Sequence, residues 1–197
     1  MTYLKRIVIA LIIIASLIVI SNEEYFSKEF NYYLNPPQQQ TINTDSTKED
    51  GTNRVQPNMI WVWSLDINAP ITYVEEVDEE LFQNALQNGV VHYPKTAPPG
   101  QNGNVYIFGH SSDFAFAKGN YKTVFALLPK VEIGAEIGIS DAEGKLYRYK
   151  VEKKFSTSPR DLEVLKQDYT KKQLTLQTSY PIGTALRRYI VVAYLIE

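Results

Sequence analysis

A histidine and a serine stand at the ends of two apolar segments, where side chains are well placed for chemistry. His110 follows the segment 104–109, which ends in Gly109. We therefore expect it at the rim of a strand, where an imidazole can transfer protons near neutral pH. Ser179 ends the segment 174–178 and enters a turn that contains Pro and Gly. A lone histidine at a strand end is also a common structural residue that hydrogen-bonds to a loop. The pattern is compatible with a catalytic histidine beside a reactive hydroxyl and with a purely structural histidine, and it does not distinguish these two interpretations.

Two arginines, Arg187 and Arg188, open the next apolar segment. If that segment pairs with 174–178 as an antiparallel hairpin, Ser179 and one arginine face each other across a groove. A guanidinium in that place could hold a substrate carbonyl or a developing oxyanion. The same spacing also fits a serine in a turn beside a surface pair of arginines.

The composition limits the possible classes of protein. The 197 residues are 44% hydrophobic and 21% charged, which is typical of one globular domain with additional segments. The net charge of -2, from 20 Lys+Arg and 22 Asp+Glu, argues against a nucleic-acid-binding protein. Two His and no Cys exclude zinc ribbons, iron–sulfur clusters, disulfides and a cysteine nucleophile. We therefore predict no metal site.

The N-terminus predicts attachment to the cell membrane. Lys5 and Arg6 precede the apolar run 7–20, whose one polar member is Ser16. The run has the length of a signal-peptide core, roughly 7–15 residues, but the residues after it lack the small pair of a cleavage site. We expect an uncleaved signal anchor over residues 1–21, a single transmembrane helix with a cytoplasmic N-terminus and an extracytoplasmic remainder. A cleaved signal peptide with a secreted product stays open.

The rest of the chain divides into a spacer and one domain. Residues 22–57 are polar and without period, which predicts an extracytoplasmic spacer whose first aromatic residues form a short interfacial helix. Residues 58–197 form the domain. Its pattern predicts roughly eight strands and two short helices, an all-β barrel or sandwich. The segments expected as strands are 59–67, 71–74, 104–109, 136–140, 145–155, 174–178 and 188–196, and those expected as helical are 78–87 and 123–128.

Together these segments resemble the sortases, membrane-anchored cysteine transpeptidases of bacterial cell surfaces. The resemblance covers about residues 61–196. It rests on a Gly-Asn-x-x-Ile-x-Gly-His block that ends at His110, and on a Thr-Leu-x-Thr block at 175–178 followed by Arg-x-Ile-Val-Val-Ala from Arg188. It implies an eight-stranded β barrel behind an N-terminal transmembrane helix, in agreement with the strand count.

The resemblance also implies roles for individual residues. His110 falls on the catalytic histidine of the family and Arg188 on its arginine, with Arg187 as the fallback and a second substrate-binding candidate. Thr178 falls on the threonine that helps to line the substrate groove. Ser179 stands where the family has its catalytic cysteine.

That difference predicts little or no activity. A hydroxyl is a poorer nucleophile than a thiolate and needs an aligned general base. His110 could be that base, and Asp113 is the one nearby carboxylate that could orient it. Loss of a catalytic nucleophile costs roughly 10⁴–10⁶ in rate in well-studied proteases. Three explanations stay open: a deliberate Cys-to-Ser replacement, a natural pseudoenzyme and a working serine variant.

The resemblance finally implies substrates. The expected reaction cleaves a Leu-Pro-x-Thr-Gly-type sorting signal of a secreted protein, joins that protein to a cell-wall precursor or pilin amine, and needs no cofactor. The segment 156–168, between two strands, is where the family contacts the sorting peptide. A binding-only pseudo-sortase that holds such peptides is the main alternative, and a membrane-tethered adhesion module without a peptide groove is a third.

Overall fold

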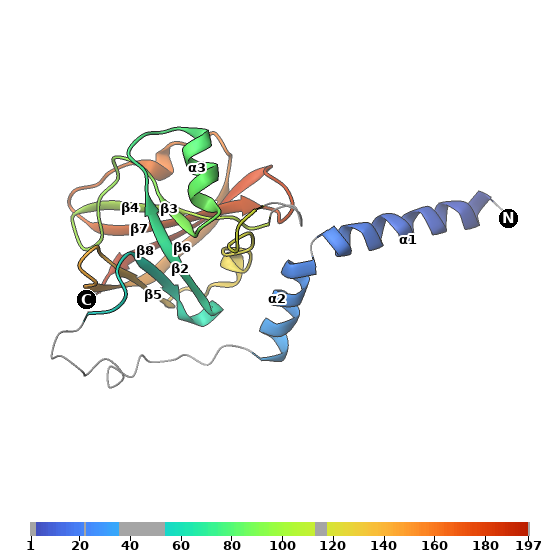
Figure 1. Ribbon diagram of the computed structural model, residues 1–197, viewed down its shortest axis with the longest axis horizontal. Helices are drawn as coiled ribbons and strands as arrows, with labels where there is room; N and C mark the ends of the chain where they lie inside the picture. Colours follow the sequence, from blue (N-terminus) through green and yellow to red (C-terminus); the bar gives the residue numbers. More distant parts are fainter. Residues whose placement is uncertain (1–2, 22, 36–53, 113–117, 197) are drawn as a thin grey trace.

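The computed structural model describes residues 3–21, 23–35, 54–112 and 118–196 (Figure 1). Eight strands close into one barrel in the order β1-β2-β3-β4-β7-β8-β6-β5, which confirms the predicted all-β barrel. The strands are β1 Met59–Val62, β2 Ile67–Tyr73, β3 Val90–His92, β4 Gly103–Phe108, β5 Glu136–Ser140, β6 Leu146–Thr157, β7 Lys172–Tyr180 and β8 Arg187–Leu195. The helices are α1 Tyr3–Ser21, α2 Glu23–Leu34 and α3 Glu79–Leu86, and the short 3₁₀ turns are η2 Trp63–Leu65, η3 Leu128–Lys130 and η4 Glu163–Leu165.

Two of the strand pairs are parallel. β2 pairs in parallel with β3 across α3, and β4 pairs in parallel with β7 across a connection that contains β5 and β6. Parallel partners point the same way, so the C-terminal ends of β4 and β7 meet at one end of the barrel. The last pair of that ladder is Phe108 opposite Gln177.

The first predicted strand, 59–67, is divided in two. The chain turns through η2, and Asp66 adopts a left-handed backbone with φ of 53°, a conformation that Asp tolerates better than most residues. Val62 then pairs with Ile67 in the β1–β2 hairpin. The three-residue strand β3 was not predicted, because all its residues are buried and show no alternation.

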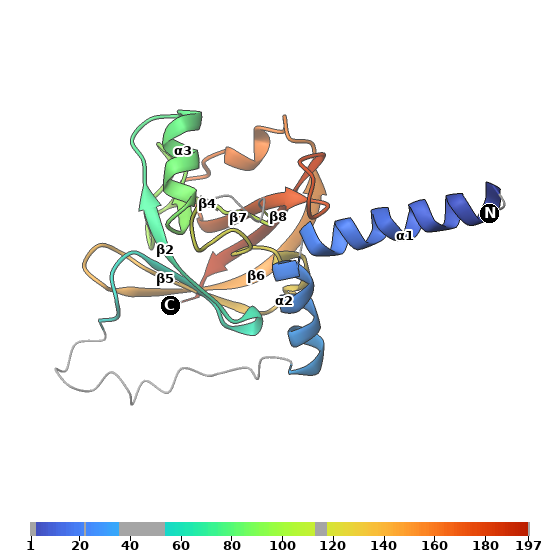
Figure 2. The same cartoon turned by 45° about the vertical axis from the view of Figure 1, so that its right-hand side comes forward.

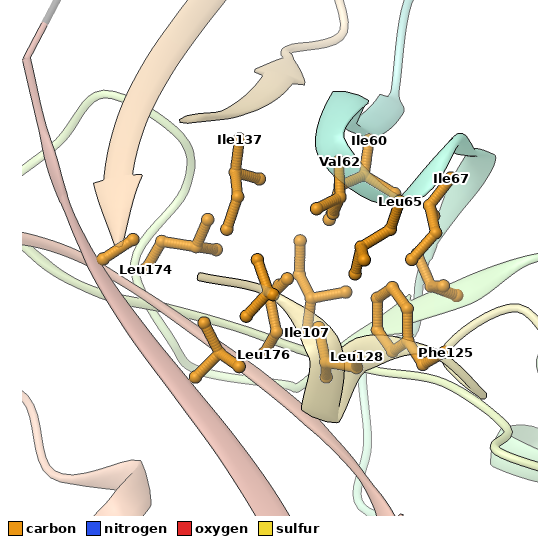
Figure 3. Close-up of a cluster of buried hydrophobic side chains, with 14 of the residues drawn as sticks. Ile60, Val62, Leu65, Ile67, Ile107, Phe125, Leu128, Ile137, Leu174 and Leu176 are labelled. Carbon is orange, nitrogen blue, oxygen red and sulfur yellow. The ribbon is translucent and has the colours of Figure 1, made fainter. Parts of the chain in front are cut away.

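Aliphatic side chains fill the barrel interior. Ile107 on β4 and Leu176 on β7 are completely buried, and each such side chain contributes roughly 1.5–3 kcal/mol relative to exposure. The segment predicted as helical, 123–128, forms turns instead, and the 3₁₀ turn η3 begins only at its last residue, Leu128. Phe125 and Leu128 cover part of this core. Figure 3 shows the cluster, with labels on Ile60, Val62, Leu65, Ile67, Ile107, Phe125, Leu128, Ile137, Leu174 and Leu176.

The N-terminal segments form two helices. α1 extends away from the barrel (Figures 1 and 2), and its described side chains are exposed. The transmembrane helix predicted over residues 1–21 is not confirmed: within the described residues, no helix combines the length and the apolarity needed to cross a membrane. α2 falls in the range predicted as a spacer, and its Tyr25 and Tyr32 pack against the barrel core.

The buried His92 predicts a pH dependence of stability. Its ring stacks on Tyr73 with 4.8 Å between ring centroids, and its Nε2 lies 3.0 Å from the Ala97 carbonyl oxygen. Burial lowers the pKa of His92 below its ordinary value, so below pH about 6.5 the unfolded chain binds a proton that the folded chain does not. The contribution of the buried, neutral His92 to the free energy of unfolding is fully present above pH about 6.5. We expect the free energy of unfolding to fall as the pH is lowered further, by at most about 1.4 kcal/mol per pH unit.

Urea unfolding of the native chain and of His92→Gln across this pH range measures the effect. The native curve should lose stability more steeply toward acid than the variant curve. Parallel curves would contradict the assignment, since carboxylates shared by both chains titrate equally in each.

Candidate active site

The β7–β8 hairpin places Ser179 directly opposite Arg188. Residues that face each other across antiparallel strands project from the same side of the sheet. The preceding pair, Thr178 and Tyr189, projects into the barrel, where Thr178 is buried. Ser179 and Arg188 are half-buried and lie on the outer side. The antiparallel pairing proposed from the sequence is therefore present, with Arg188 as the residue facing Ser179.

The β4–β7 pairing brings His110 to the same end of the barrel. Gly109 N donates to the Gln177 carbonyl at 3.1 Å, and Thr178 Oγ1 donates to the Gly109 carbonyl at 2.9 Å. A Cβ on Gly109 would lie 2.8 Å from the Phe125 ring, so only glycine lets the chain pass here. Phe125 N also donates to the His110 carbonyl at 2.8 Å. The backbone before and at His110 is thus fixed from two sides.

The segment after His110 is tied to the turn after Ser179. Gly183 N in the β7–β8 turn donates to Ser112 Oγ at 2.9 Å. Asp113, the carboxylate considered as a partner of His110, lies outside the described residues.

His110, Thr178, Ser179 and Arg188 line one cavity of about 330 Å³. Its floor is the outer face of β4 and β7, and its two walls are α3 and the segment 159–165, which carries η4. Figure 2 shows α3 and this orange segment on either side above β4, β7 and β8. The remaining lining is Glu79, Phe82, Gln83, Leu86, Tyr93, Tyr106, Phe108, Gly109, Pro159, Asp161, Leu162, Val164, Leu165 and Gln177. The walls present apolar side chains such as Phe82 and Leu162 together with polar ones such as Asp161, and a mixed lining of this kind is typical of ligand sites.

Tyr106 forms a neutral polar floor for this cavity. Its hydroxyl donates to Gln177 Oε1 at 2.6 Å, and its side chain is only 2% exposed. Burial raises the pKa of Tyr106 far above its ordinary value, while the charge of Arg188 acts in the opposite direction. The phenol therefore stays protonated at neutral pH and within electrostatic reach of the guanidinium.

The two adjacent arginines have different surroundings. Arg188 Nη1 donates to the Ala185 and Arg187 carbonyls, each at 3.3 Å, and the residue borders the cavity. Arg187 is exposed and donates to Ser156 Oγ at 3.1 Å and to the Ser156 carbonyl at 3.0 Å on β6. It does not line the cavity. Of the two candidate arginines, the structure therefore brings only Arg188 to Ser179.

Asn104 holds one wall of the cavity in place. Its side-chain amide donates to the Val164 carbonyl at 3.0 Å and accepts from Thr175 Oγ1 at 2.8 Å. Gln167 accepts from Asn104 N at 2.9 Å and donates to the Asn104 carbonyl at 3.2 Å. Asn104 is 1% exposed. These bonds fasten the β6–β7 segment to β4 beside the cavity.

Sequence reasoning missed the floor and the α3 wall of the cavity, while the other wall, 159–165, falls within the segment 156–168 that the resemblance implies for peptide contact. Tyr106 and Gln177 lie in segments that the sequence predicts as apolar strands. Alternation around Ile107 and Leu176 places both side chains on the face that points away from the barrel interior. Phe82 on α3 was recognised only as part of an amphipathic helix. No local signal shows that the outer face of a strand is covered by another segment.

Known proteins of similar sequence and structure share this architecture. The family model for the Sortase domain matches residues 60–196. Sortase D of Bacillus subtilis (strain 168) is 28% identical over 128 residues, which is 64% of this chain and 57% of that protein. The match thus spans less than two thirds of that relative.

Two solved structures illustrate the likeness. A Clostridium perfringens Sortase D5 transpeptidase is 28% identical with a TM-score of 0.58, covering 89% of this chain and 96% of that one. Sortase A from Corynebacterium diphtheriae shares the fold, with a TM-score of 0.59 at 23% identity, over 85% of this chain and 74% of that one.

Removing the Asn104 amide should loosen the cavity wall. We expect Asn104→Ala to lower the free energy of unfolding by about 1–3 kcal/mol, since the buried Thr175 hydroxyl loses its acceptor and the Val164 carbonyl loses the donor on Asn104. Backbone amides of 162–167 should exchange with deuterium faster than in the native chain. Thr170→Ala is the matched control, because it removes only the exposed bond to Asp168 and should change stability by less than about 0.5 kcal/mol. Unchanged exchange over 162–167 in Asn104→Ala would contradict the positioning role.

Proposed function

Because this chain belongs to the sortase family, whose members are transpeptidases, we propose that its 330 Å³ cavity receives the sorting-signal peptide of a secreted protein. The observation that carries this proposal is the meeting of His110, Ser179 and Arg188 in one cavity with apolar walls. A Leu-Pro-x-Thr-Gly-type peptide fits that chemistry: its apolar residues contact the walls, and its scissile carbonyl reaches the polar end. We propose a cell-surface role, where such signals and their amine acceptors occur.

Each polar residue has a distinct role in the proposed reaction. The side chain at position 179 passes its proton to His110 and attacks the carbonyl carbon of the Thr in the signal; the C–N bond between Thr and Gly then breaks and an acyl-enzyme forms. The Arg188 guanidinium stabilises the oxyanion, since it is the cation opposite that side chain. His110 protonates the leaving amine. A cell-wall precursor or pilin amine then attacks the acyl group and releases the joined product.

The serine limits the reaction in this chain. A hydroxyl is un-ionised at neutral pH and must be deprotonated as it attacks. Among the described residues, two carboxylates line the cavity, and both are engaged elsewhere: Asp161 accepts from the Thr157 hydroxyl and from Glu163 N, and Glu79 accepts from Gln83 Nε2. We propose that the chain binds sorting peptides and turns them over slowly or not at all.

Ser179 also carries a second candidate function. Serine keeps the size and the polar end of the cavity that a cysteine would give, while it lacks the reactive thiolate. A pseudo-sortase that holds sorting signals without cleaving them would need such a site. The two functions differ in whether a thiol at position 179 produces turnover.

Restoring a thiol should reveal the reaction. We expect the full chain with Ser179→Cys to cleave a quenched Leu-Pro-x-Thr-Gly-type peptide library and to transfer the products to a glycine-based amine, read by mass spectrometry. The native chain should be slower by roughly 10⁴–10⁶. Ser27→Cys is the matched control, because it adds a thiol on the exposed side of α2 and should stay inactive.

The other results discriminate between the alternatives. Equal turnover by the native chain would show a working serine enzyme and overturn the inactivity. Silence in both chains with retained peptide affinity would favour the binding-only function. No peptide affinity in either chain would refute the peptide groove itself.

Replacing the arginines separately tests which one acts. In the Ser179→Cys background, Arg188→Lys should lower kcat/KM about 10²–10³-fold, since a planar pair of donors beside the oxyanion is lost. Arg187→Lys should change it by less than about threefold, because Arg187 binds Ser156 outside the cavity. A larger loss in Arg187→Lys than in Arg188→Lys would reverse the assignment.

A further inference from the structure

A second and larger cleft lies between α2 and the tip of the β1–β2 hairpin. Both views show the teal hairpin tip directed toward the blue α2 (Figures 1 and 2). The cleft has a volume of about 850 Å³, within the range of about 300–1,000 Å³ that is typical of small-molecule sites. It shares no lining residue with the cavity at Ser179. The proposed peptide chemistry therefore does not account for it.

Aromatic rings form the barrel side of this cleft. The chain has two tryptophans, Trp61 and Trp63, and both line the cleft half-buried, together with Tyr121. Trp61 projects outward because its neighbours on β1 fill the core. Gly138 on β5 pairs with Trp61, and a Cβ there would lie 2.5 Å from the Trp63 ring. The glycine thus makes room for the second indole beside the first.

Neutral amides provide the polar part of the lining. Asn31 comes from α2, Asn35 directly follows α2, Asn68 lies on β2 and Asn120 in the connection after β4, and all four are exposed. Among the described lining residues, Asp66 is the one carboxylate. The surface facing the cleft therefore combines aromatic faces with uncharged hydrogen-bond donors and acceptors.

The charged lysine in the lining is engaged within the protein. Lys28 Nζ donates to Thr123 Oγ1 at 2.6 Å and lies 3.7 Å from Glu24 Oε1. A phosphate or sulfate would need a cluster of basic side chains, which this lining lacks in its described residues. The chemistry does not favour an anionic ligand.

The α2 wall is fastened to the barrel, so the cleft is preformed. Lys130 Nζ donates to Tyr33 Oη at 2.6 Å and pairs with Glu29 at 3.0 Å. Thr123 Oγ1 donates to Glu24 Oε1 at 2.6 Å. Preformed sites lose little conformational entropy on binding. A ligand would meet both walls already in place.

We propose that this cleft binds a neutral oligosaccharide. The C–H faces of pyranose rings are apolar and pack against aromatic side chains, whose hydrophobic surface is large. The hydroxyls at the ring edges exchange hydrogen bonds with amides such as Asn68 and Asn35. The cleft combines both features in one lining. The proposal does not rest on transpeptidation.

Intrinsic fluorescence of the full native chain tests the proposal, since both tryptophans of the protein lie in the cleft. The probes are chitotetraose, cellotetraose and a sulfated heparin tetrasaccharide, each added up to about 10 mM, which covers weak millimolar affinities. We expect a saturable change in tryptophan emission with at least one of the two neutral probes.

Two variants and one control locate the site. Trp61→Ala should raise Kd at least about tenfold through loss of the stacking surface. Asn68→Ala, at an exposed position, should raise Kd about three- to tenfold with an unchanged thermal unfolding midpoint, so misfolding is excluded. Phe30→Ala is the matched control on the exposed side of α2 and should leave Kd unchanged.

Three results would overturn the proposal. One is the absence of a saturable change with both neutral probes. Another is binding of the sulfated probe alone, which would mark an anion site. The third is equal affinity of the native chain, Trp61→Ala and Asn68→Ala, which would place binding elsewhere. Peptide affinity of the native chain, measured in parallel, separates failure here from failure of the proposed function.

Discussion

Gly109, directly after β4, donates its N–H to the Gln177 carbonyl of β7. β4 and β7 run in parallel, although 63 residues lie between them in the sequence. The candidate active site depends on this pairing. It carries His110 to the end of β7, where the antiparallel β8 supplies Arg188 opposite Ser179. Without the parallel pairing of β4 and β7, His110 and Ser179, which are distant in the sequence, would not be brought together in space. The closed barrel makes the arrangement stiff, because each strand is bonded on both sides.

The outer face of these strands is unusual for a barrel because it is largely covered. Tyr106 and Thr175 are as buried as core residues, although they point away from the interior. α3 and the β6–β7 segment provide the cover, and Asn104 joins that segment to the floor. The polar groups of the floor satisfy one another by hydrogen bonds, as Tyr106 and Gln177 do. The result is a partly enclosed cavity that has His110, Ser179 and Arg188 among its lining residues.

Local pattern predicted much of the barrel, and it failed where distant contacts decide. Alternation and turn residues identified strands such as β5 and β6. Spacing alone left His110 and Ser179 open, and the resemblance to the sortases singled them out; the structure places both in one cavity. The three residues of β3 carry no period because both their faces are buried. The docking of α2 depends on partners about a hundred residues away, such as Lys130 with Tyr33. No window of sequence contains both members of such a pair.

Arg187 and Arg188 are neighbours in sequence and lie on opposite faces of β8, so the core decides which of them reaches the cavity. Sliding β8 by one residue would exchange the two arginines, and it would also turn the fully buried Val191 and Ala193 toward the outside. Because β8 is bonded to β7 and β6, such a slip would break two ladders at once. Aliphatic packing inside the barrel therefore determines which of the two arginines faces the cavity. A substitution at Val191, far from the cavity, consequently affects the charge that stands beside Ser179.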